Sequence, residues 1–212
     1  MQLPLYDEVM STALLFPTVI QTDQIADSTF MADLETACWM IEDGDTAGHD
    51  WCEREGYPGY TSYASLDDLA QRAPAFSELV SRLDQYAAAF AKQLHWDLGS
   101  ARLKCDSLWV NVLGESGHHS GHIHPNSVIS GTCYVAVPKG AGQIKFEDPR
   151  LPMMMATPRL KMDAPSPAQR FHYIAPAPGE VLMWESWLRH EVMTSQSEDA
   201  RISISFNYSV AD

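Results

Sequence analysis

The spacing of apolar residues changes near residue 108 and divides the chain into a helical part and a β-rich part. Within 26–42, Leu34, Cys38 and Ile41 recur at helical spacing. The stretch 74–95 begins with proline and carries an apolar residue every three or four positions. This pattern predicts a long amphipathic helix that packs on a sheet. Residues 65–68 have the pattern of a capping box, which predicts a short helix that opens there.

The β-rich part contains short apolar runs separated by Gly and Pro turns. These runs occupy 109–113, 130–137, 143–146, 169–174, 181–184 and 201–210. Short strands at such near-regular spacing are typical of an antiparallel barrel or sandwich. We therefore expect a mainly β fold with flanking helices, formed by one domain over residues 1–212. The longest irregular stretch, 149–168, carries five prolines and four methionines, and a long loop of this kind is often a lid or a binding loop.

Charge and composition exclude several classes of function. The 212 residues carry a formal net charge of −14, with 28 acidic against 14 basic residues, which argues against a nucleic-acid or anionic-membrane partner. No run approaches the ~20 apolar residues of a membrane span, and the first residues lack the basic region of a signal peptide. The four cysteines show no paired spacing and are expected to be reduced thiols. We expect a cytoplasmic protein.

Three histidines form the strongest chemical pattern in the chain. His122 and His124 are two residues apart, so on a β-strand their side chains would leave the same face. His190 follows 66 residues after His124, which leaves room for several strands to return it to the pair. Neutral imidazole binds iron, zinc, copper and nickel. The pattern predicts a transition-metal site and leaves the metal open.

The last predicted strand alternates between apolar and polar positions. Ile202, Ile204 and Phe206 share one face, and the polar residues that begin with Arg201 and Ser203 share the other. An arginine and a serine two apart on a strand suit a carboxylate ligand, which arginine can bind through two hydrogen bonds. The same pattern also fits an ordinary solvent-facing side with one charge, and the strand alone does not decide between the two.

Taken together, these motifs resemble the 2-oxoglutarate/Fe(II)-dependent oxygenases of bacteria and phages. The resemblance covers nearly the whole chain. It rests on Trp109-Val110-Asn111, Gly117, His122-x-His124-Pro125-Asn126-Ser127, Ser130-Gly131, Tyr134, Pro138, Gly142, Phe146-x-Asp148-Pro149-Arg150, Pro178-Gly179-Glu180, Trp187-Leu188-x-His190 and Arg201-x-Ser203-x-Ser205-x-Asn207. Leu15-Phe16-Pro17-Thr18 and the helix at 74–95 also fit.

The resemblance implies a fold and a pair of cofactors. The fold is a double-stranded β-helix, or jelly roll, in which 108–212 form the core and 1–107 supply mostly helical support plus an N-terminal strand. The cofactors are Fe(II) and, as cosubstrate, 2-oxoglutarate. The implied activity is that of a dioxygenase that hydroxylates its substrate. His122 takes the first-ligand place on the second core strand, and His190 takes the distal-ligand place on the seventh. Arg201 and Ser203 would grip the distal carboxylate of 2-oxoglutarate, and Tyr134 and Asn111 would hydrogen-bond it.

His124 departs from the wider superfamily, which has an aspartate or glutamate at this position. A neutral imidazole leaves the Fe(II) site at a formal charge of +2, and three imidazoles must stay unprotonated to bind the metal. We therefore expect metal loss below about pH 6. Glu147, Asp148 and Glu185 are the alternatives for a carboxylate ligand, but none has the required spacing.

Other readings of the same residues stay open. Three histidines with water at zinc would form a hydrolytic site, a cupin-like dioxygenase would use three histidines without 2-oxoglutarate, and a non-catalytic binding module would keep only a structural metal. The pair Arg201 and Ser203 favours the oxygenase, because the rivals do not need it. The substrate, a small molecule or a peptide, is not specified, and we expect a homodimer because C2 dimers are the commonest soluble oligomers. We expect His118 and His119 in a solvated loop, with an active-site rim as the alternative. We expect Trp184 and Trp187 in the core, where one of them could also line the pocket.

Overall fold

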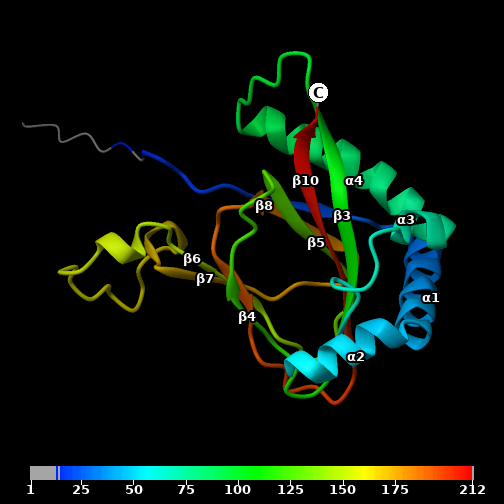
Figure 1. The fold of residues 1–212 in the computed structure, drawn as a ribbon. Helices are drawn as coiled ribbons and strands as arrows, with labels where there is room; N and C mark the ends of the chain where they lie inside the picture. The colour runs from blue at the N-terminus through cyan, green and yellow to red at the C-terminus, as the bar shows by residue number, and fades with distance from the viewer. Residues whose placement is uncertain (1–12, 14, 212) are drawn as a thin grey trace, which may run out of the picture.

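The computed structural model describes residue 13 and residues 15–211, which form two antiparallel sheets with helices on one side (Figure 1). The helices are α1 (Ser28–Gly44), α2 (Thr46–Glu55), α3 (Leu69–Arg72) and α4 (Pro74–Gln93). The strands are β1 (Ile20–Gln24), β2 (Tyr60–Thr61), β3 (Arg102–Leu113), β4 (His119–His122), β5 (Ile129–Ala136), β6 (Ile144–Glu147), β7 (Phe171–Ile174), β8 (Glu180–Glu185), β9 (His190–Val192) and β10 (Arg201–Ala211). Two 3-10 turns, η1 (Leu151–Met153) and η2 (Ser166–Ala168), lie between β6 and β7.

The strands divide into a larger and a smaller sheet. The larger sheet has the order β1-β8-β5-β10-β3-β2, and the smaller one has the order β4-β9-β6-β7. Neighbours that are distant in sequence, such as β5 and β10, pair directly, as the crossing connections of a jelly roll require. The predicted mainly β fold with flanking helices is confirmed.

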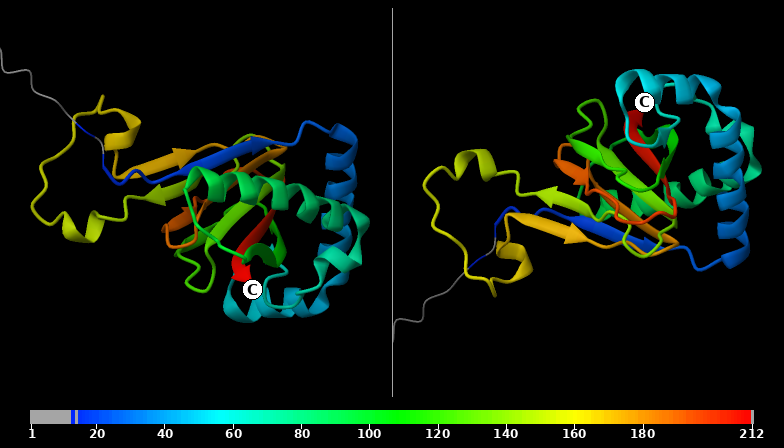
Figure 2. Two further views of the ribbon diagram at one scale, coloured as in Figure 1. Left: turned by 90° about the horizontal axis from the view of Figure 1, so that it is seen from above. Right: turned by 90° about the horizontal axis from the view of Figure 1, so that it is seen from below.

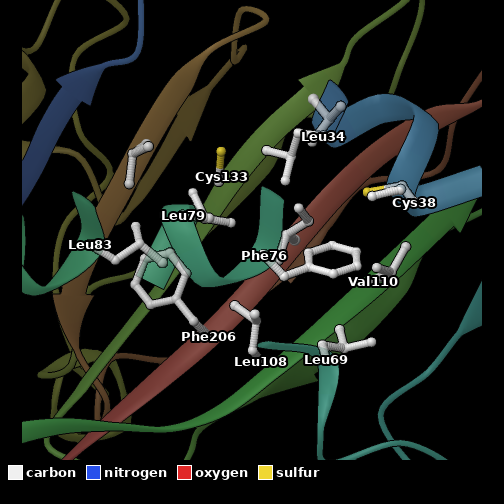
Figure 3. Close-up of a cluster of buried hydrophobic side chains, with 14 of the residues drawn as sticks. Leu34, Cys38, Leu69, Phe76, Leu79, Leu83, Leu108, Val110, Cys133 and Phe206 are labelled. Atoms are coloured by element: carbon white, nitrogen blue, oxygen red, sulfur yellow. The ribbon is translucent and has the colours of Figure 1, made fainter. Parts of the chain in front are cut away.

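The main hydrophobic core lies between the helices and the larger sheet (Figure 3). Leu34 from α1 and Leu83 from α4 are completely buried there, and Ile204 and Phe206 of β10 meet them from the sheet. This burial explains why the alternation in β10 is strict: its apolar face closes the core, and its polar face is left for the space between the sheets. A second, smaller cluster fills that space; it contains Tyr134, Ile144, Phe146, Leu182, Trp184 and Leu188.

Several local predictions need correction. The helix at 74–95 ends at Gln93, and α2 was not predicted. The proposed capping box is wrong, because the Ser65 hydroxyl donates to the Asp45 carboxylate at 2.5 Å instead of capping a helix, and α3 begins only at Leu69. Asp45 is buried and is the N-cap residue of α2. Ser65 therefore makes a tertiary contact with the start of α2. The first strand of the predicted core, expected from 108, begins at Arg102.

The connection between β6 and β7 projects from the body on the side away from the helices (Figures 1 and 2). It contains the proline- and methionine-rich stretch 149–168 that the sequence marks as irregular, and its only regular structure is the two short 3-10 turns. Across the described residues, no helix has the length and apolar character needed to cross a membrane.

Candidate metal centre

The three histidines predicted to bind a metal lie together between the two sheets. His122 is the last residue of β4 and His190 is the first of β9, and the two are direct partners in the ladder. His124 lies two residues beyond the end of β4, where its backbone N–H donates to the carbonyl of Ser186 at 3.0 Å. One ligand nitrogen of each imidazole lies within 4.8 Å of the others. The expectation that one strand would carry both His122 and His124 is therefore wrong, although the two side chains still converge.

The hydrogen bonds of the three rings fix which nitrogen is free. Each Nδ1 lies beside an oxygen that only accepts: the Ser120 carbonyl for His122 at 2.7 Å, the Asn207 side-chain oxygen for His124 at 2.7 Å, and the Leu188 carbonyl for His190 at 2.9 Å. These contacts assign the proton to Nδ1 and leave the Nε2 lone pair of each ring available. The Nε2 of His124 is buried without a hydrogen-bond partner among the described residues. A nitrogen that serves as a metal ligand is expected to have no other partner.

Burial keeps these imidazoles neutral. It lowers the pKa of His122 and of His124, and it holds the pKa of His190 well below the usual histidine value. The neighbouring imidazoles add to this effect at His124 and His190 through repulsion between their charged forms. Because a protonated imidazole cannot bind a metal, a lowered pKa favours the metal-binding form.

No carboxylate joins the cluster among the residues that the structure describes. Glu147 faces the guanidinium of Arg189 at 3.5 Å, and Asp148 pairs with Arg150 at 2.8 Å. Glu185, the third alternative, ends β8 and lies outside the group of convergent ligand atoms. The donor set that the structure brings together is thus three neutral nitrogens, a set that suits iron, zinc, copper or nickel.

A buried arginine lies in the same pocket. Arg201, the first residue of β10, is 2% exposed, and one of its terminal nitrogens donates to the Ser203 hydroxyl at 3.2 Å. Among the described residues, its Nε has no hydrogen-bond partner and no carboxylate pairs with the guanidinium. A buried charge without a counter-charge is strongly unfavourable. The pocket therefore fits an anionic ligand at this end.

Tyr134 and Asn111 line the pocket beside Arg201. The Tyr134 ring lies 5.0 Å from the guanidinium carbon, and its buried hydroxyl has no partner in the described structure. Burial raises the pKa of Tyr134 to about 12, so the hydroxyl is a donor. Asn111 is already held: its side-chain oxygen accepts from Thr61 at 2.9 Å, and its nitrogen donates to Ser205 at 3.1 Å. Asn111 keeps one N–H for a further acceptor.

Two further residues line the pocket: Tyr57, which no sequence motif predicted, and His119, for which an active-site rim was the second expectation. His119 stacks on His122 with ring centroids 4.4 Å apart, and the Tyr57 ring meets His119 edge-on at 5.6 Å. The Tyr57 hydroxyl is buried and unpartnered among the described residues, like that of Tyr134. The solvated-loop prediction for His119 is wrong, because His119 is the first residue of β4 and lines the pocket. Its burial there lowers its pKa to about 4, whereas His118 is exposed as expected.

The two tryptophans near His190 have different environments. Trp184 is 1% exposed and meets the His190 ring edge-on at 4.7 Å between centroids. It therefore belongs to the core and also lines the pocket. Trp187 is 46% exposed, so the prediction that it is a core residue is wrong.

Comparison with known proteins identifies the β-rich part. Residues 107–207 match a family model described as "Putative 2OG-Fe(II) oxygenase". The jelly-roll core of this chain is therefore similar to the 2OG-Fe(II) oxygenase family. The cofactors of that family are Fe(II) and 2-oxoglutarate. A search among curated proteins found no match.

Solved structures share the oxygenase fold over most of the chain. A prolyl-4-hydroxylase from Pseudomonas putida matches with 14% identity and a TM-score of 0.56, covering 91% of this chain and 92% of that one. The epimerase SnoN from nogalamycin biosynthesis, in complex with Fe3+ and alpha ketoglutarate, matches with 13% identity and a TM-score of 0.63, covering 91% and 79%. HygX from Streptomyces hygroscopicus, with nickel and 2-oxoglutarate, matches with 13% identity and a TM-score of 0.60, covering 91% and 83%. These likenesses show a shared double-stranded β-helix fold.

Proposed function

We propose that this protein is a Fe(II)- and 2-oxoglutarate-dependent oxygenase that hydroxylates its substrate and holds its metal with three histidines. The observation that carries the proposal is Arg201, a buried guanidinium without a counter-charge in the pocket that contains the three imidazoles. A metal site alone would not need this cation. A dicarboxylate that reaches from the metal to the arginine accounts for both features.

In this proposal, His122, His124 and His190 hold Fe(II) through Nε2. The Nδ1–H groups of the three rings donate to the oxygens of Ser120, Asn207 and Leu188. These outer contacts orient the rings and make each ring a better donor. Three neutral ligands leave the formal charge of Fe(II) undiminished, which strengthens the attraction of an anionic cosubstrate.

The far end of the cosubstrate would lie among hydrogen-bond donors. Arg201 would bind the distal carboxylate with Ser203, and the hydroxyls of Tyr134 and Tyr57 lack other partners in the described structure and are available to it. Each of these donors is already buried, so the bound anion would supply the hydrogen-bond acceptor that the donor lacks. Trp184 and Leu113 line the pocket and restrict water.

When bound, Fe(II) and 2-oxoglutarate supply the activation of dioxygen that a protein side chain cannot provide. The balanced reaction converts 2-oxoglutarate, dioxygen and R–H into succinate, carbon dioxide and R–OH. The protein side chains contribute binding, orientation and exclusion of water, and the reaction requires no side chain as a nucleophile.

Succinate formation from 2-oxoglutarate tests the proposal. Protein loaded with Fe(II) without oxygen is exposed to dioxygen, and succinate and metal content are measured for the wild type, Arg201→Met and the exposed control Arg102→Met. We expect Arg201→Met to keep the metal and lose succinate formation, while Arg102→Met retains both. Zinc in place of iron with no succinate would favour a three-histidine hydrolase. Iron with substrate oxidation that does not need 2-oxoglutarate would favour a cupin-like dioxygenase.

A further inference from the structure

Residues 148–173, here called the arm, comprise the connection between β6 and β7 and the first three residues of β7. The arm extends away from the helices (Figures 1 and 2). Internal hydrogen bonds hold its shape: the Gln169 side chain donates to the Ala164 carbonyl at 2.7 Å, and Arg170 donates to the Pro158 carbonyl at 2.7 Å. The arm is therefore a loop whose conformation is held by its own hydrogen bonds.

Apolar side chains on the arm are exposed to an unusual degree. Met153 is 75% exposed and Met155 is 94% exposed. Leu160, Met162, Phe171 and Tyr173 are also among the exposed large apolar residues. A cluster of exposed apolar side chains is typical of an interaction site, and flexible methionines are common on surfaces that bind peptides of varied sequence.

The arm is also cationic, in contrast with the rest of the chain. Residues 148–173 contain three arginines and one lysine against two acidic residues, Asp148 and Asp163, and so carry a net charge of +2, whereas the whole chain has a net charge of −14. Arg159, Lys161 and Arg170 have no carboxylate partner among the described residues. The local charge favours an anionic ligand, while the acidic remainder of the chain repels an extended polyanion such as a nucleic acid.

A groove combines these apolar and cationic groups. It has a volume of about 330 Å³ and is lined by Arg159, Leu160, Gln169, Arg170, Phe171 and Tyr173. Its walls contain two aromatic rings, a leucine side chain and two guanidinium groups. This chemistry fits a peptide that carries acidic side chains beside apolar ones.

The position of the arm relates it to the metal centre. Across the smaller sheet, His122 pairs with His190, His190 with Phe146, and Phe146 with His172. The arm therefore leaves the sheet at the end where the histidines lie. Phe171 and Tyr173 alternate with the half-buried His172 and are exposed, so they lie on the outer face of the sheet.

We propose that the arm is a docking site for an acidic segment of a polypeptide, which binds across the groove through Arg159, Lys161 and the exposed apolar side chains. Binding to the arm does not require the metal. The same polypeptide would also be the substrate, bound where the arm leaves the sheet beside the metal centre. This second step rests on the proposed oxygenase function.

Fluorescence anisotropy on metal-free protein tests the docking site independently of any catalysis. The probes are a labelled short peptide of alternating Glu and Leu with one Phe, the same peptide with Lys in place of Glu, and a labelled single-stranded DNA. We expect the acidic peptide to bind at least about tenfold more tightly than the basic one, with an affinity that falls as salt rises. Tighter binding of the DNA, or equal binding of the two peptides, would overturn the proposal.

Charge reversal locates the site. The double variant Arg159→Glu/Lys161→Glu changes two exposed side chains of the arm, and Lys92→Glu/Arg102→Glu makes the same change in net charge at exposed positions outside it. We expect the first variant to weaken binding of the acidic peptide about tenfold or more and the second to change it less than about twofold. Equal losses in both variants would show a non-specific effect of net charge and would contradict the docking site. Met155→Ser, which removes an exposed apolar side chain, is expected to weaken binding without changing its salt dependence.

Discussion

The Nδ1 of His124 lies 2.7 Å from the side-chain oxygen of Asn207, although the two residues are 83 positions apart. The same oxygen accepts from the Ser130 hydroxyl at 2.8 Å, and the Asn207 nitrogen donates to the Ser107 hydroxyl at 3.2 Å. These contacts orient the amide so that its oxygen faces the imidazole. Asn207 therefore holds His124 in the form whose Nε2 is free, at the position where the wider superfamily has a carboxylate.

Replacing Asn207 should weaken metal binding without removing a ligand. In Asn207→Leu, the His124 ring loses the acceptor that fixes its proton, and we expect metal affinity to fall about 10- to 100-fold, as is typical when an outer partner of a ligand is lost. Asn207→Asp keeps an acceptor at the same place and should retain most of the affinity. Competition with a chelating dye measures both. Equal losses in the two variants would indicate a general packing defect.

The Tyr57 hydroxyl should contribute to cosubstrate binding. In Tyr57→Phe, we expect the affinity for 2-oxoglutarate to fall about tenfold or more, because a hydrogen bond to a charged group contributes about 1.5–3 kcal/mol. Calorimetric titration of the zinc-loaded protein with 2-oxoglutarate measures this without turnover. The matched control is Tyr63→Phe, since Tyr63 is 61% exposed. Metal affinity should stay unchanged in both, and an unchanged 2-oxoglutarate affinity in Tyr57→Phe would remove this residue from the site.

Periodicity and short motifs along the chain predicted part of this architecture. The alternation in β10 correctly separated the buried Ile204 from the pocket residue Ser203, because a strand has a strict two-residue period. The roles of Tyr57 and Asn207 could not be found in this way. Tyr57 reaches the pocket from the connection between α2 and β2, and Asn207 acts across 83 residues. Such contacts depend on how distant elements pack, which no local pattern specifies.

The stability of the metal-free protein should fall on acidification in the range where free histidine titrates. Burial lowers the pKa of His119 to about 4 from an ordinary value of 6.5. Between these values the unfolded chain binds more protons than the folded one, so the free energy of unfolding decreases as pH falls through this window and is unaffected by His119 above it. Urea unfolding at several pH values in the presence of a chelator measures how steeply the free energy of unfolding changes with pH. We expect His119→Asn to reduce the slope, while the exposed control His118→Asn leaves it unchanged.

The lowered pKa values of the three ligand histidines shift the expected onset of metal loss to lower pH. Burial lowers the pKa of His122 and His124 and holds that of His190 well below the usual range. Protons therefore compete with the metal only at lower pH than they would at free histidines. Metal titrations should show binding retained through about pH 6 and lost further below it. Loss already complete near pH 6.5 would contradict the buried environment of the cluster.

Gly131 in β5 should be required for the packing of the two central strands. A Cβ at this position would collide with the Phe206 ring and would lie 2.5 Å from the Leu182 carbonyl oxygen. We expect Gly131→Ala to lower the free energy of unfolding by about 1–3 kcal/mol or more through overpacking. Gly44→Ala is the control, since a Cβ there meets nothing within 4 Å. Chemical denaturation measures both, and equal stabilities would contradict the close approach of β5 and β10.

The ligand set is the central claim, and X-ray absorption at the iron edge of the Fe(II)-loaded, oxygen-free protein tests it most directly. The wild-type spectrum should contain the scattering of three imidazole rings, and His124→Ala should lose one of them. The matched variant His118→Ala should leave the spectrum unchanged, because His118 lies outside the cluster. A wild-type spectrum with two imidazoles and a carboxylate, or one that does not change in His124→Ala, would contradict a three-histidine centre.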